Sequence, residues 1–121
     1  MKKSLFLLAL AAGISLQNFA QGWPSAYEGV MLQGFYWDSF NDSRWTKLEA
    51  QSNEIAPYFN LIWVPQSGNC NTDNNVMGYL PVYLFDHKSS FGTEAELRSM
   101  IKTYKAKGTG IIADVVINHR N

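Results

Sequence analysis

Three short apolar runs, separated by stretches of helical periodicity, constrain the fold of this chain more than any other feature. The runs cover residues 29–35, 61–64 and 110–117, and residues 45–59 and 93–107 lie between them with apolar side chains at helical spacing. An alternation of strands and helices with nearly continuous apolar strands is typical of a parallel sheet with crossover helices. Doubly wound sheets and β/α barrels both begin in this way. No glycine-rich phosphate loop follows any of the runs, which argues against a nucleotide-binding fold.

The expected helices differ in how clearly their ends are marked. Asp42 and Ser43 are candidate N-caps for the first helix. The second helix begins at a capping box formed by Thr93 and Glu96, and Gly108 is a natural stop. The run at 61–64 fits a strand buried on both faces. No regular element is expected between residues 66 and 92, although aromatic side chains there favour an ordered connection.

The first twenty residues have the pattern of a secretory signal peptide. Two lysines precede an apolar stretch from Leu5 to Leu16, and Ala20 offers a cleavage site before Gln21. The stretch is well short of the roughly 20 residues that span a bilayer, so insertion in the membrane is disfavoured. We therefore expect a signal peptide at 1–20, a barrel domain at 21–121, and a secreted or periplasmic protein.

Charge and cysteine content narrow the possible partners. Removal of the two leader lysines leaves a slightly acidic chain without a basic patch, which argues against nucleic acid as a partner. Cys70 is the only cysteine, so the chain cannot form an internal disulfide, and no Cys/His cluster suggests zinc. These features fit an exported bacterial protein.

Polar and aromatic residues follow each expected strand. Trp37 follows the first, Tyr79 lies in the connection after the second, and Asn118 and His119 end the third. In a β/α barrel the carboxyl ends of the strands form the active face, so we expect these residues to gather there. Asp114 lies inside the third strand, where an unpaired carboxylate is costly.

Residue chemistry alone leaves the roles of these side chains open. Asp114 is equally a structural carboxylate or a support for an active site. Asn118 offers an oxygen that suits calcium, but turn formation or strand capping is the simpler interpretation. For a lone histidine such as His119, a structural role is favoured. Strict alternation puts it on the opposite strand face from Asp114, but we expect the strand to have ended by His119, so this parity need not hold. Trp37 and Tyr79 are candidate binding surfaces.

Three blocks of the sequence resemble the α-amylase family of retaining glycoside hydrolases. Residues 114–119, Asp-Val-Val-Ile-Asn-His, resemble its first conserved motif, and residues 29–38 resemble its first barrel strand. Residues 78–93, with Gly-Tyr-Leu-Pro, Phe-Asp and Phe-Gly-Thr, resemble the loop after its second strand in plant-like and bacterial members. The resemblance implies an α/β fold, namely the first three strands and two helices of a (β/α)8 TIM barrel. That barrel would be incomplete, because a whole one takes about 250 residues.

The resemblance also implies hydrolysis of internal α-1,4 bonds of starch-like glucans with retention of configuration. Retaining chemistry needs paired carboxylates about 5–5.5 Å apart. In the family these carboxylates follow later strands, so we assign no catalytic residue to this chain and expect them beyond Asn121. A truncated barrel of this kind is expected to be inactive and unstable alone.

The resemblance gives a role to each residue at the strand ends. It implies that Tyr79 and His119 contact the sugar beside the cleaved bond, and Trp37 is a further candidate for stacking on sugar. It implies that Asn118 is one calcium ligand, with other oxygens needed from elsewhere because Ca²⁺ takes about 6–8. Asp114 is implied to be a structural carboxylate.

Three alternatives remain open. The first is another α-glucan-active hydrolase or transferase of the same family. The second is a non-catalytic glucan-binding remnant. The third, an unrelated periplasmic α/β binding protein, is disfavoured by the order of the three blocks. The sequence gives no indication of the oligomeric state.

Overall fold

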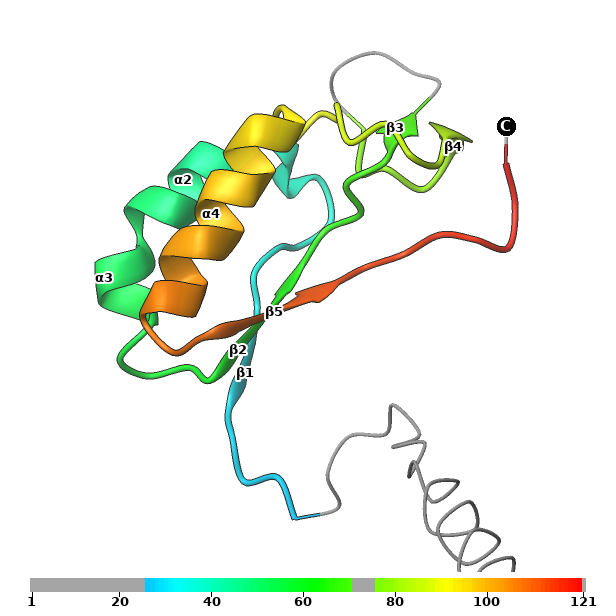
Figure 1. Ribbon diagram of the computed structural model, residues 1–121. Helices are drawn as coiled ribbons and strands as arrows, with labels where there is room; N and C mark the ends of the chain where they lie inside the picture. The colour runs from blue at the N-terminus through cyan, green and yellow to red at the C-terminus, as the bar shows by residue number, and fades with distance from the viewer. Residues whose placement is uncertain (1–25, 71–75, 121) are drawn as a thin grey trace, which may run out of the picture.

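The computed structural model describes residues 26–70 and 76–120 (Figure 1). The expected signal peptide at 1–20 and its cleavage site after Ala20 lie outside the described residues. Across the described ranges, no helix combines the length and apolar character needed to cross a membrane.

A parallel sheet of three strands lies at the centre of the fold, in the order β1–β2–β5. These strands cover Met31–Gln33, Leu61–Val64 and Gly110–Ala113. The register aligns Leu32 with Ile62, and Ile62 with Ile111. Parallel neighbours need a crossover connection, and helices supply both crossovers. The expected alternation of strand and helix is therefore confirmed.

The helices gather on one face of this sheet, where α2 and α4 lie side by side (Figure 1). A short 3-10 turn, η1, spans Ser39–Asn41, followed by α2 at Trp45–Ala50, α3 at Ser52–Ile55 and α4 at Glu94–Ala106. The prediction of one continuous helix over residues 45–59 is wrong. The backbone leaves helical geometry at Gln51, with ψ near 0°, and helix α3 ends before Pro57, which lacks an amide donor.

The two long crossovers begin differently. Arg44 is the N-cap of α2 and makes no side-chain cap, so the prediction of Asp42 or Ser43 is wrong. The Ser43 hydroxyl donates instead to Ser39 Oγ, 2.9 Å away. The capping box of α4 is confirmed, because the Glu96 amide donates to Thr93 Oγ1 at 3.3 Å and the Thr93 amide donates to the Glu96 carboxylate at 2.7 Å.

The core lies between the helices and the sheet. Trp45, Ile62, Met100 and Tyr104 are fully buried there. The Tyr104 hydroxyl donates to the carbonyl of Leu48 at 2.7 Å, which ties α4 to α2.

Strand β2 is only half covered. Ile62 and Val64 are buried against the helices, whereas Leu61 and Trp63 on the other face are partly accessible. The expectation of burial on both faces is therefore wrong for the described residues, because the helices cover one side of the sheet. This second face includes Met31, which is 48% exposed.

The connection at 66–92 contains a small ribbon that the sequence did not predict. Strands β3 (Asn69–Cys70) and β4 (Pro81–Tyr83) pair antiparallel, with Asn69 opposite Tyr83. The ribbon lies beyond the carboxyl end of β2 (Figure 1). Strand β5 also ends earlier than expected, at Ala113, so Asp114 follows the strand instead of lying inside it.

Candidate functional site

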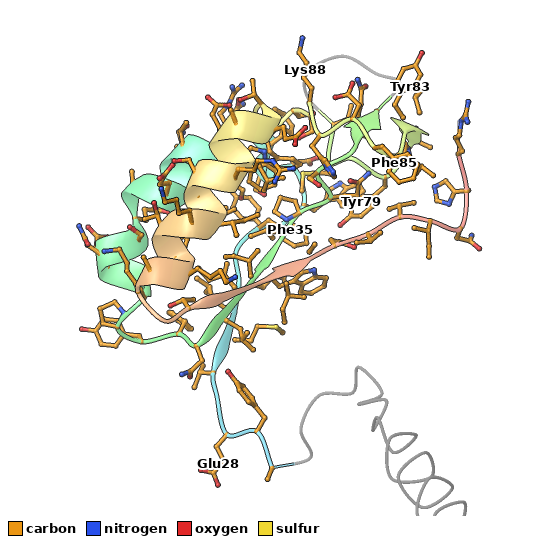
Figure 2. The ribbon with its side chains drawn as sticks, in the orientation of Figure 1. Glu28, Phe35, Tyr79, Tyr83, Phe85 and Lys88 are labelled. Carbon is orange, nitrogen blue, oxygen red and sulfur yellow. The ribbon has the colours of Figure 1, made fainter. Side chains whose placement is uncertain are left out.

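The carboxyl edge of the sheet brings together segments that are far apart in the chain. The turn after β1, the connection after β2 and the tail after β5 all leave the sheet at this edge (Figure 1). Figure 2 shows Tyr79 between the end of β2 and the tail. The site is therefore built from three strand ends, as expected for a parallel sheet.

Tyr79 is the centre of the site and has three partners. Its hydroxyl donates to Asp114 Oδ2 at 2.8 Å, and its carbonyl oxygen lies 2.7 Å from His119 Nε2. Its ring is parallel to that of Trp37, with 5.9 Å between the ring centroids and an interplanar angle of 2°. The structure thus brings Trp37, Tyr79, Asp114 and His119 into one cluster.

The electrostatics of the cluster keep the Tyr79 phenol neutral. Partial burial, followed by the hydrogen bond to Asp114 and the charge of that carboxylate, raises the pKa of Tyr79 to about 12. At neutral pH the phenol is therefore a hydrogen-bond donor, and the Asp114 carboxylate is its acceptor.

Backbone geometry explains why His119 and Asp114 reach the same residue. Strict strand alternation would place them on opposite faces. Because β5 ends at Ala113, the tail no longer follows that alternation, and both side chains contact Tyr79. A carbonyl oxygen only accepts hydrogen bonds, so Nε2 of His119 is the protonated ring nitrogen in this contact.

The turn that carries Trp37 is held by its own hydrogen bonds. The Tyr36 amide donates to Ser39 Oγ at 3.1 Å, and the Tyr36 hydroxyl donates to the Asp42 carboxylate, which raises the pKa of Tyr36. Asp38 follows Trp37 with φ of +68°, a left-handed conformation that is uncommon outside glycine. This left-handed residue is the N-cap of η1, so the turn begins directly after Trp37.

Sequence reasoning missed Gln66, which positions the segment before Tyr79. Gln66 is 6% exposed, and its Nε2 donates to the Gly78 carbonyl at 3.0 Å. Gly78 has φ of +95°, and a Cβ there would lie 3.0 Å from the Gln66 carbonyl oxygen, so a glycine is required. The available signal was a polar residue directly after the apolar strand and Pro65.

Asn118, the expected calcium ligand, is exposed and lies outside the Tyr79 cluster. Within residues 26–70 and 76–120, no group of three or more His, Cys, Asp or Glu side chains could hold a metal ion. One amide oxygen falls far short of the roughly 6–8 ligands that Ca²⁺ takes. The described residues alone therefore do not fit a complete calcium site.

Known alpha-amylases are among the proteins that this chain resembles in sequence. No protein-family model matches the chain. The chain is 31% identical over 85% of its length to alpha-amylase 3, chloroplastic, of Arabidopsis thaliana, and 34% identical over 98% to an alpha-amylase of Aeromonas hydrophila. It spans 11% and 26% of the lengths of these relatives.

A solved structure shares the fold. The trehalose-6-phosphate hydrolase of Bacillus licheniformis matches 76% of this chain with a TM-score of 0.63 and 21% sequence identity, and the match covers 17% of that enzyme. The expectation of three strands from a β/α barrel is confirmed by this likeness and by the parallel β1–β2–β5 sheet. By its sequence, the chain belongs to the α-amylase family of glycoside hydrolases.

Proposed function

We propose that the chain is part of a secreted α-amylase that hydrolyses internal α-1,4 bonds of starch-like glucans with retention of configuration. The observation that carries this proposal is the convergence of Tyr79 and His119 at the carboxyl edge of the sheet. His119 Nε2 lies 2.7 Å from the backbone carbonyl oxygen of Tyr79. An aromatic ring offers an apolar surface for the C–H face of a pyranose, and an imidazole offers polar contacts for its hydroxyls.

In this proposal each residue of the cluster has a separate task. Tyr79 is the platform for one glucose unit, and the Asp114 carboxylate holds its hydroxyl. The bond from His119 to the Tyr79 carbonyl holds the imidazole beside the ring. All of these groups bind and orient substrate, and none of them breaks the glycosidic bond.

The bond-breaking carboxylates belong to other strands of the barrel in this proposal. Retaining hydrolysis needs two carboxyl groups about 5–5.5 Å apart, one as nucleophile and one as acid and base. Asp114 is the one carboxylate that contacts Tyr79 among the described residues, and it is occupied by the phenol. We therefore expect the 121-residue chain to be inactive by itself.

Calcium and export complete the proposal. When bound, calcium would stabilise the loops around the substrate, and Asn118 would supply one of its oxygen ligands together with residues from elsewhere. The leader at 1–20 directs export to the periplasm or the medium, where starch is the expected partner.

A non-catalytic glucan-binding protein is a second candidate, because the cluster supplies binding groups and no carboxylate pair. Another α-glucan-active hydrolase or transferase of the family would use the same cluster. Hydrolysis gives shorter glucans, transfer gives longer ones as well, and binding without turnover gives no product. A product analysis therefore separates the three.

The test uses the protein expressed from its complete reading frame. We expect it to bind maltoheptaose and not cellohexaose, because the two differ in the linkage that sets the curvature of the glucan. We expect Tyr79→Ala to weaken the binding of maltoheptaose about tenfold or more, which is about 1.4 kcal/mol by calorimetry. Tyr58→Ala is the matched control, because Tyr58 is 75% exposed and follows α3 far from the cluster.

Two results would contradict this proposal. One is equal binding of maltoheptaose and cellohexaose by the wild-type protein. The other is unchanged affinity in Tyr79→Ala. Nuclear magnetic resonance of the first products then gives their anomeric configuration, and an inverted product would exclude the retaining mechanism.

A further inference from the structure

Trp37 contacts Tyr79 in a geometry that suggests a role different from the sugar stacking that the sequence predicts for it. The Trp37 side chain is 71% exposed, yet its ring is within 2° of parallel to the Tyr79 ring. Offset parallel rings are a favourable arrangement of aromatic pairs. Trp37 therefore restrains the Tyr79 ring.

The two hydrogen bonds of Tyr79 do not restrain the rotation of its ring about χ2. The hydroxyl oxygen lies on the axis about which the phenol ring turns, so the bond to Asp114 fixes the end of that axis and not the plane of the ring. The bond from His119 reaches the backbone carbonyl and also leaves the ring plane free. Aromatic χ2 torsions have broad minima, so the plane is set by what packs against the ring, which includes the buried core and Trp37.

Trp37 supplies one such contact from a turn that is itself fixed. Ser39 is fully buried and accepts the Tyr36 amide, and Ser43 donates to the same hydroxyl oxygen. The Ser39 amide in turn donates to the Tyr36 carbonyl at 3.0 Å. These bonds hold the backbone on both sides of Trp37, so the turn that carries its ring is fixed.

We propose that Trp37 is a positioning residue that, together with the core contacts of Tyr79, sets the plane of the Tyr79 ring to which a glucose unit binds. This inference rests on the proposed function, because the plane matters only if a sugar stacks on Tyr79.

The test compares Trp37→Leu, which removes the aromatic face, with Trp37→Phe, which keeps one. Both variants are made in the protein expressed from its complete reading frame and labelled with 3-fluorotyrosine, and the Tyr79 signal is identified by its loss in Tyr79→Phe. We expect Trp37→Leu to shift the Tyr79 fluorine resonance without ligand, because the neighbouring ring current is lost, and to weaken maltoheptaose binding about three- to tenfold. Trp37→Phe should restore affinity to within about twofold.

The possible outcomes separate the inference from the function on which it rests. Tyr58→Leu is the control for loss of an exposed aromatic residue and should change neither the Tyr79 resonance nor the affinity. If Trp37→Leu weakens maltoheptaose binding by the same factor in a Tyr79→Ala background as in the wild type, Trp37 contacts the sugar itself, which overturns the inference. Normal binding by Trp37→Leu overturns it as well. A wild-type protein that does not bind maltoheptaose overturns the proposed function instead.

Discussion

Two tyrosine hydroxyls make long-range hydrogen bonds, one in the core and one in the candidate site. Tyr104 lies in the core and donates to the Leu48 carbonyl, and Tyr79 donates to Asp114 in the cluster. Burial raises the pKa of each to about 12, with the Asp114 carboxylate contributing further at Tyr79. Both side chains therefore act as neutral donors at neutral pH.

These shifts predict how stability depends on alkaline pH. The folded-state pKa of each phenol lies above the reference value of 10.0, so the folded state favours the protonated form. The resulting stabilisation is complete below about pH 10 and is lost as the pH rises towards 12. Urea unfolding of the protein from its complete reading frame should show this loss, and it should be smaller in the Tyr79→Phe, Tyr104→Phe double variant. An identical pH dependence in that variant would contradict the prediction.

At the scale of single elements, α4 is the helix whose start is most clearly encoded. Thr93 and Glu96 satisfy each other's backbone amides at its N-terminus, and Gly108 with φ of +83° follows its end. Burial of Leu97, Met100 and Tyr104 then attaches the helix to the core. Local signals and packing agree along its whole length.

The capping box gives a prediction for α4. Thr93→Ala removes the acceptor for the Glu96 amide and should lower the free energy of unfolding by about 1 kcal/mol. Thr93→Ser keeps the oxygen and should retain most of the stability. Thr46→Ala on the exposed side of α2 is the matched control and should change stability by less than about 0.5 kcal/mol. A Thr93→Ser variant as unstable as Thr93→Ala would argue against the cap.

Elements with strong local signals could be predicted from the sequence, and those set by tertiary contacts could not. The β–α–β–α–β order and the bounds of α4 follow from apolar spacing and caps. The break between α2 and α3 has no such signal, because Gln51 is an ordinary helix former. The ribbon of β3 and β4 is only two and three residues long, too short for a periodic pattern.

The candidate site, too, could be predicted only in part. The rule that parallel strands share a carboxyl edge was enough to expect Trp37, Tyr79 and His119 near one another. It did not predict the hydrogen bond between Tyr79 and Asp114, because that contact depends on β5 ending at Ala113. Gln66 was missed because its role depends on the backbone of Gly78, which the sequence does not specify.

At the scale of the whole molecule, one face of the sheet is left open by the described residues. Helices cover the other face, whereas Met31 and Gln33 of β1 are exposed on this side. Strands β1 and β5 also have outer edges that no described strand pairs with. Open edges and exposed apolar faces favour association between chains.

We therefore predict that the purified 121-residue chain associates in solution and does not hydrolyse starch. Size-exclusion chromatography and a reducing-end assay measure the two properties. Met31→Lys should increase the monomer fraction of this chain, because it places a charge on the exposed face. The same substitution should destabilise a protein in which further strands close the barrel over Met31. A monomeric wild-type chain that releases reducing ends from starch would contradict the prediction.

The hydrogen bonds of Tyr79 join residues 35 and 40 positions apart along the sequence, and each crosses a complete strand–helix–strand unit. Contacts of such long range close large loops and form only after the intervening segments have given up their freedom. The turn of Trp37, in contrast, closes through bonds between residues three and four positions apart. We therefore expect the turn of Trp37 to form before the contacts of Tyr79, so that the stacking of the two rings is among the last contacts completed on folding.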